Sequence, residues 1–147
     1  MSRLLFAALW LAGCAVTPEP AEPLLRNPSA PVGSQTDATL ARLAGDWVVV
    51  EGAGLRPGTP LRFDARQVTL GDAVIPVTAL GQGRFALGSQ EVWIHWLDAD
   101  NRTAALGDRA GTRVWIMDRK GYPAERLRAA REILDWYGYD LDLLDRT

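Results

Sequence analysis

The chain has 147 residues, of which 48% are apolar and 23% are charged, and its formal net charge at pH 7 is −2. This length allows one domain with a short extension, and a charge so close to neutral offers no basic field for nucleic acid. A single histidine and a single cysteine cannot furnish a typical zinc site, so we expect no metal and no cofactor.

The first 14 residues have the pattern of a secretory signal. A positive Arg3 precedes an apolar stretch too short to span a bilayer, and small residues lead to Cys14. The tetrapeptide Leu-Ala-Gly-Cys at 11–14 resembles the lipobox of bacterial lipoproteins. This resemblance implies removal of residues 1–13 and attachment of a diacylglyceryl group to Cys14. The alternative is an ordinary secreted protein with an incidental cysteine in its signal peptide.

A proline-rich segment follows over residues 14–38. Proline fixes φ and removes amide donors, so we expect an extended, semi-rigid tether between the lipidated cysteine and a domain at 39–147. Ala15 follows the cysteine, where some lipoproteins of the inner membrane carry aspartate. The resemblance therefore implies an outer-membrane location with the domain facing the periplasm. The prolines of the tether are Pro18, Pro20, Pro23, Pro28 and Pro31.

Short strands separated by turn residues make up most of the domain. They predict a mainly β fold, a small eight-stranded antiparallel up-and-down barrel, with a compact sandwich as the alternative. Pro76 must lie at an edge or a bulge because it has no amide proton. The predicted strands span 46–51, 60–64, 66–70, 73–80, 83–87, 91–97, 102–107 and 113–119.

One helix is predicted after the strands, over residues 123–137. Pro123 suits its first turn and Gly138 suits its C-terminal cap. Apolar residues at helical spacing form one face, so we expect the helix to pack outside the barrel. A helix on the membrane surface is the alternative, although its polar face mixes both charge signs. Residues 139–144 predict one further short strand at an edge.

Two residues at the ends of the strand region are expected to meet. Trp47, in the sequence Gly45-Asp46-Trp47, opens the first strand, and Arg119 ends the last. The first and last strands of a closed barrel are neighbours. A guanidinium stacked on the indole would plug one end, a cation–π contact of about 0.5–2 kcal/mol. The alternative is that the two side chains never meet.

This pairing resembles the lipocalin family. In lipocalins a Gly-x-Trp on strand one, here Gly45 and Trp47, meets an arginine from the end of strand eight, here Arg119, and a helix packs outside. Residues 101–104 occupy the position of the second lipocalin motif, and 123–141 is similar to bacterial lipocalins. The chain thus resembles a bacterial lipocalin lipoprotein. It departs from the family over 52–90, where the strands and the loop after strand one are short.

The predicted strand at 91–97 is apolar on both faces, as a barrel wall covered by a helix would be. We expect the face with Trp93, His95 and Leu97 to line the lumen, because a histidine among aromatic rings can orient a ligand head group. A histidine satisfied within the wall and plain core packing are the alternatives. With two residues of strand eight added, the candidate ligand-binding residues are Trp93, His95, Leu97, Trp115 and Met117.

No catalytic set is apparent. The single histidine has no evident nucleophile and orienting acid, and no Gly-x-Ser-x-Gly elbow occurs. Asp98 and Asp100 fall in a turn-rich loop, where carboxylates commonly bond to the backbone. We therefore expect a protein that is not an enzyme.

The lipocalin resemblance implies a lipid-anchored envelope lipoprotein that binds, stores or transports small hydrophobic or amphipathic molecules, such as fatty acids or lysophospholipids. The alternative is a structural or protein-interaction module with a filled, non-binding barrel. Residues 43–47 and 61–64 resemble the opening of META-type β domains and favour that alternative. The sequence leaves open the ligand, the state of the lumen and the oligomeric state.

Overall fold

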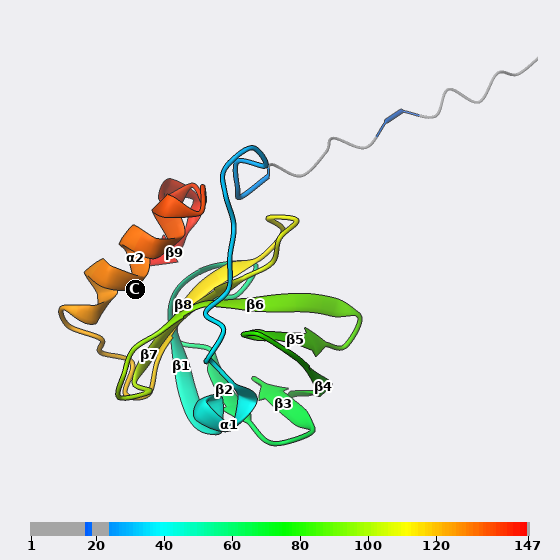
Figure 1. Ribbon diagram of the computed structural model, residues 1–147. Helices are drawn as coiled ribbons and strands as arrows, with labels where there is room; N and C mark the ends of the chain where they lie inside the picture. The colour runs from blue at the N-terminus through cyan, green and yellow to red at the C-terminus, as the bar shows by residue number, and fades with distance from the viewer. Residues whose placement is uncertain (1–16, 19–23, 147) are drawn as a thin grey trace, which may run out of the picture.

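The computed structural model describes residues 17–18 and 24–146, so the predicted signal peptide and Cys14 lie outside the described residues (Figure 1). Eight antiparallel strands follow the order β2-β3-β4-β5-β6-β7-β8-β1, and pairing of β1 with β2 closes them into a barrel. The predicted mainly β barrel is confirmed. The strands are β1 (Gly45–Ala53), β2 (Pro60–Phe63), β3 (Gln67–Leu70), β4 (Ala73–Gly81), β5 (Arg84–Leu87), β6 (Gln90–Leu97), β7 (Thr103–Gly107) and β8 (Val114–Asp118).

Helix α2 (Arg126–Trp136) lies against the outside of the barrel over β7 (Figure 1). Its buried Ala130 and Leu134 belong to an apolar cluster with residues on the outer face of β7 and β8. The predicted cap is present, because Gly138 has a φ of +84° and the Gly138 amide bonds to the Asp135 carbonyl at 2.9 Å. The helix thus begins three residues later and ends one residue earlier than predicted.

The chain continues past α2 to a short 3-10 turn, η1 (Leu141–Leu143), and a final strand, β9 (Asp145–Arg146). β9 pairs with Glu51 and Gly52 at the end of β1. The strand predicted over 139–144 is therefore wrong in position, because those residues form the turn that carries the chain back to the barrel.

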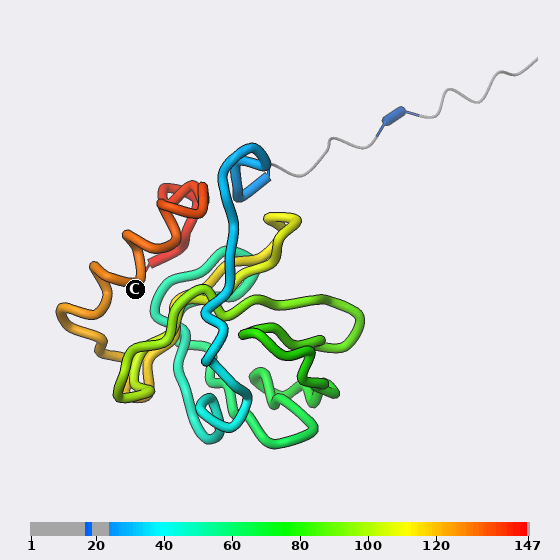
Figure 2. The backbone as a smooth tube through the Cα atoms, viewed as in Figure 1, coloured from blue at the N-terminus to red at the C-terminus, as the bar shows by residue number. Residues whose placement is uncertain are grey.

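Residues 24–38 pack onto the domain rather than forming a free spacer. The Leu25 amide bonds to the Gly111 carbonyl at 2.9 Å, and the Gln35 amide bonds to the Ile94 carbonyl at 2.8 Å. Figure 2 shows this segment running down the barrel to α1 (Leu40–Leu43). The predicted tether is wrong for residues 24–38, because backbone pairing here outweighs the spacer character of the prolines.

Three β-bulges interrupt the barrel wall, one of them in β4 against β5 between Ala79 and Gly81. The register of β1 against β8 shifts between Val49 and Glu51, and that of β6 against β7 shifts between Ile94 and Trp96. Each bulge adds one residue and so reverses which later residues face inward. In β1 the shift turns Glu51 outward, where its carboxylate pairs with Arg131 of α2 at 3.0 Å.

Pro76 lies within β4, opposite Gln67, the first residue of β3. The pairing of β4 with β5 begins only at Val77. Pro76 therefore occupies a point where the ladders on both sides end, as its missing amide proton requires.

Candidate functional site

The interior of the barrel is filled by its own side chains. Trp47, Phe63, Phe85, Trp115 and Met117 all belong to the interior cluster, and none is more than 1% exposed. A void that could hold water would leave the side chains around it accessible. These five side chains therefore border no water-sized space, and the predicted lumen is closed in this structure.

The candidate ligand-binding residues do not share one face. Leu97, Trp115 and Met117 lie in the interior cluster as expected. Trp93 and His95 instead point outside the barrel, so the prediction that they line the lumen is wrong. The physical reason is the bulge at His95, which places Ile94 and Leu97 on the same face although they are three residues apart.

Three buried side-chain nitrogens have no hydrogen-bond partner among the described residues: Trp115 Nε1, Arg26 Nε and Arg84 Nε. An unpaired buried donor costs about 1–3 kcal/mol. Trp115 Nε1 lies in the barrel interior, whereas the two arginines lie outside the wall. Because these atoms are buried, a ligand could bond to them only after neighbouring side chains move.

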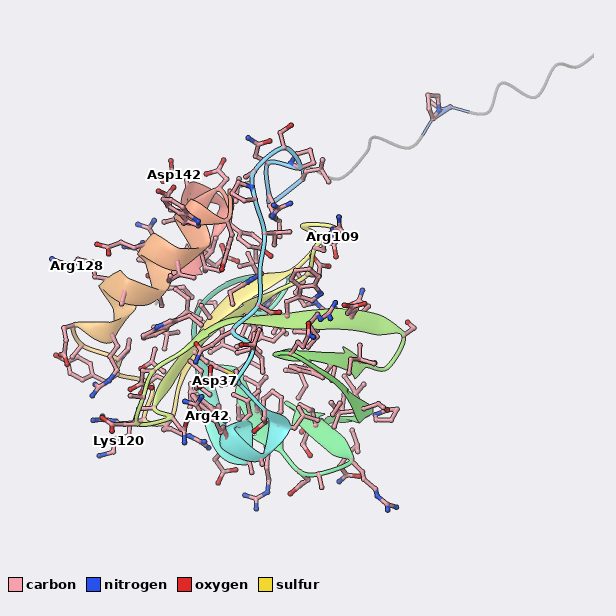
Figure 3. All side chains as sticks on the ribbon, in the orientation of Figure 1. Asp37, Arg42, Arg109, Lys120, Arg128 and Asp142 are labelled. Atoms are coloured by element: carbon pink, nitrogen blue, oxygen red, sulfur yellow. The ribbon has the colours of Figure 1, made fainter. Side chains whose placement is uncertain are left out.

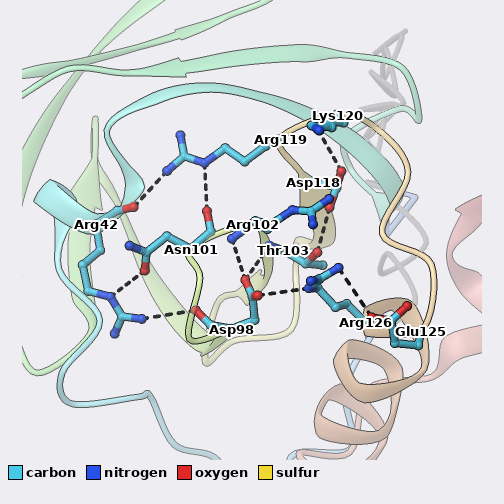
Figure 4. Close-up of polar contacts among 10 residues, drawn as sticks. All are labelled: Arg42, Asp98, Asn101, Arg102, Thr103, Asp118, Arg119, Lys120, Glu125 and Arg126. Atoms are coloured by element: carbon cyan, nitrogen blue, oxygen red, sulfur yellow. Dashed lines mark hydrogen bonds and ion pairs between the residues drawn. The ribbon is translucent and has the colours of Figure 1, made fainter.

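The base of the barrel is closed as predicted. The Arg119 guanidinium carbon lies 3.8 Å from the centre of the Trp47 ring. Burial lowers the pKa of Arg119, yet its nitrogens donate to the carbonyls of Arg42 at 3.0 Å and Asn101 at 2.9 Å (Figure 4). Gly45 has a φ of +100°, and a Cβ there would lie 3.1 Å from Arg119. Gly45, Trp47 and Arg119 thus form the structural plug.

Asp98 links the turn after β6 to helix α2. Its carboxylate accepts hydrogen bonds from the Thr103 amide at 2.8 Å and from Arg126 Nε at 3.1 Å (Figure 4). Burial raises the pKa of Asp98, but the hydrogen bonds from Thr103, Arg102 and Arg126 outweigh it and hold the pKa below its ordinary value. Asp98 thus bonds to the backbone of its turn, as predicted, and its contact with Arg126 also joins this turn to α2.

A polar network lies outside the wall around His95, which is 3% exposed. Its Nδ1 is 2.6 Å from the Gly33 carbonyl, and its Nε2 is 2.8 Å from Tyr139 Oη. Tyr139 Oη is also 2.8 Å from the Asp108 carbonyl. Gly107 leaves room for this arrangement, because a Cβ there would lie 3.1 Å from His95 Nε2.

The network is one proton short when His95 is neutral. Nδ1 must carry a proton to bond to the Gly33 carbonyl, which leaves Nε2 as an acceptor. The single Tyr139 hydroxyl proton then serves either Nε2 or the Asp108 carbonyl. Burial nevertheless lowers the pKa of His95 to about 4, and burial also raises the pKa of Tyr139. The histidine is therefore a neutral part of the wall at pH 7.

A groove of about 440 Å³ lies beside this network on the outer surface. We name it the Trp93 groove. The β5–β6 hairpin forms one side, and the loop between β7 and β8 forms the other. Sequence patterns missed it because it is formed by two hairpins that are separate in the sequence and come together only in the fold. The side chains that matter below are Arg84, Glu91, Trp93, Asp108, Arg109 and Thr112.

Neither a metal site nor a membrane span is found in the described part of the chain. No three histidine, cysteine, aspartate or glutamate residues among residues 17–18 and 24–146 are grouped so that they could hold a metal ion. No helix in the same residues is long and apolar enough to cross a membrane.

Comparison with known proteins bears on the fold. No family model matches the chain, and no curated protein matches it. Among solved structures, the barrel is similar to the crystal structure of the major allergen Per a 4 from cockroaches, with a TM-score of 0.62 and 13% sequence identity. The match covers 82% of this chain and 95% of the allergen. The likeness shows that the fold is a lipocalin-like barrel.

Proposed function

We propose that this chain is a lipid-anchored protein of the bacterial cell envelope, attached through Cys14, whose filled barrel is a structural or interaction module acting through its outer surface. The observation that carries the proposal is the packed interior. Trp47, Phe85 and Trp115 fill the space in which an open barrel would hold a ligand. No enzymatic step is part of this proposal.

Binding of a small hydrophobic or amphipathic molecule inside the barrel is the second candidate. Two observations favour it: the lipocalin-like fold, and the unpartnered Nε1 of Trp115 in the interior. A ligand could enter only by displacing side chains that now contact one another. Fatty acids and lysophospholipids are the molecules expected from the resemblance to bacterial lipocalins.

Titration with N-phenyl-1-naphthylamine separates the two candidates. This uncharged fluorophore brightens in apolar pockets and carries no acid that would select a charged surface site. The full chain with Cys14→Ser is titrated at micromolar concentrations, and Trp115→Phe serves as the matched interior variant. We expect no saturable rise in emission. Saturable binding that Trp115→Phe alters would support the second candidate instead.

The anchor is tested separately, because the barrel and the lipid attachment are independent parts of the proposal. In cells supplied with labelled palmitate, the wild-type chain should carry the label and fractionate with the outer membrane. The Cys14→Ser chain should carry none and leave the membrane fraction. Equal membrane association of the two chains would contradict the anchor without bearing on the barrel.

A further inference from the structure

The Trp93 groove contains carboxylates that are already occupied. Glu91 Oε1 accepts a hydrogen bond from Trp93 Nε1 at 2.8 Å. The Asp108 carboxylate accepts from the Thr112 amide at 2.7 Å and from the Thr112 hydroxyl. A cationic ligand would have to compete with these internal donors, so the groove is poorly suited to cations.

The cations of the groove are, in contrast, weakly engaged. Arg84 Nε has no partner, and the other contacts of this guanidinium are long, 3.8 Å to Glu91 Oε1 and 3.4 Å to Gln82 Oε1. Arg109 lies at the tip of the β7–β8 loop and forms no ion pair within the described residues (Figure 3). Guanidinium N–H groups on both sides of the groove could therefore donate hydrogen bonds to an anion.

A third cation lies behind the same loop. Arg26 is only 5% exposed, and a Cβ on Gly111 of the loop would lie 2.7 Å from the Arg26 Cβ. Its Nη2 donates to the Ala30 carbonyl at 2.5 Å, but its Nε has no partner, and in the described part of the chain the side chain forms no ion pair. A buried charge without a counterion is costly, and a nearby anion would lower that cost.

Trp93 supplies an apolar surface in the groove. Its indole is partly exposed, and the Arg84 guanidinium lies 5.4 Å from its centre. The hydrogen bond from its Nε1 to Glu91 fixes the orientation of the ring. An indole held beside free guanidinium donors combines a hydrophobic contact with an anion contact.

The geometry points to a ligand-binding site in the Trp93 groove for a small molecule that joins one acidic group to an apolar or aromatic part. The acid, a carboxylate, phosphate or sulfonate, bonds to Arg84 and Arg109. The apolar part lies against the Trp93 indole. The site is outside the barrel, so it requires neither an open interior nor the lipid anchor.

Calorimetric titration of the full Cys14→Ser chain tests this site. Naphthalene-1-sulfonate is the probe, 1-naphthalenemethanol is its uncharged analogue, and sodium sulfate supplies the anion alone. We expect saturable binding of the sulfonate and binding at least about tenfold weaker for each of the other two. Equal binding of the uncharged analogue would overturn the proposal. Decanoate and decyl phosphate form two further arms that distinguish a carboxylate from a phosphate.

Variants locate the binding. Arg84→Gln and Arg109→Gln should each weaken the binding of naphthalene-1-sulfonate by about tenfold. Trp93→Leu should also weaken this binding. Arg66→Gln removes an exposed arginine from the β2–β3 turn and is the matched control, which should bind like the wild type. Thermal unfolding confirms that each variant is folded. Undiminished binding in folded Arg84→Gln and Arg109→Gln would overturn the assignment.

Discussion

The Arg119 guanidinium stacks on the Trp47 indole at 3.8 Å and, in the same position, donates to four backbone carbonyls, those of Arg42, Ala44, Asp46 and Asn101. One side chain therefore joins α1, the start of β1 and the turn before β7. Because the interior above it is packed, this plug is the floor of a core rather than of an open cup.

Replacing Arg119 by methionine should lower the free energy of unfolding by about 2–4 kcal/mol. The change removes the cation–π contact and leaves carbonyls unpaired near the base. Urea unfolding measures the difference, with Arg66→Met as an exposed control expected to change stability by less than about 0.5 kcal/mol. Equal losses in the two variants would contradict the structural role of the plug.

The Glu51–Arg131 pair tests the bulge in β1. Glu51 is 4% exposed, and its carboxylate lies 3.0 Å from Arg131 Nε. Arg131→Leu should lower the free energy of unfolding by about 2 kcal/mol, because it leaves a buried carboxylate without its partner. Adding Glu51→Leu should recover part of that loss, since the double variant has no unpaired charge. The free energies of unfolding of the two single variants and of the double variant are measured in urea. If the loss in the double variant equals the sum of the two single losses, the side chains do not interact.

Stability should fall as the pH drops from about 6.5 to about 4. The folded pKa of His95 is lowered to about 4, against an ordinary 6.5, so the neutral ring stabilises the fold fully above pH 6.5. As the pH falls the unfolded chain takes up the proton first, and the loss reaches about 3 kcal/mol. His95→Gln should remove most of this dependence in urea unfolding series. If the free energy of unfolding of His95→Gln depends on pH as steeply as that of the wild type, His95 is not the group responsible.

Gly107→Ala should be destabilising by about 2 kcal/mol, because an added methyl meets a ring held on both sides. A Cβ at this position would lie 2.8 Å from Tyr139 Cζ. Combining the change with Tyr139→Phe removes the Tyr139 hydroxyl oxygen, the atom nearest to the added methyl, and should restore part of the lost stability. No difference in melting temperature between Gly107→Ala and the wild type would show that the contact is looser than described.

The strands and the closed base could be predicted from sequence because their signals are local. Alternation and turn residues located the eight strands, and Trp47 and Arg119 lie at the two ends that barrel closure brings together. The faces of β6 could not be predicted in this way. One extra residue at His95 reverses the alternation, and a bulge of this kind has no compositional signal in the strand.

The other differences arise from contacts between distant segments. The prolines at 28 and 31 indicate a spacer when only neighbouring residues are considered. The backbone hydrogen bonds of Leu25 with Gly111 and of Gln35 with Ile94 join distant parts of the sequence, and no periodicity of the sequence predicts them. The Trp93 groove likewise depends on residues 108–110 and 112 of the β7–β8 loop, which line the same space as Arg84 and Trp93. A site made by such contacts becomes visible only once the tertiary structure is known.

The central claim is that the interior is filled and that ligand chemistry lies outside, and the indole N–H signals of the tryptophans test it most directly. Decanoate could enter either place, because it carries both an acid and an apolar chain. In ¹⁵N–¹H spectra of the full Cys14→Ser chain, decanoate should shift the Trp93 indole signal saturably and leave that of Trp115 unmoved. A saturable shift of Trp115 with Trp93 unchanged would contradict the account and place the ligand inside the barrel.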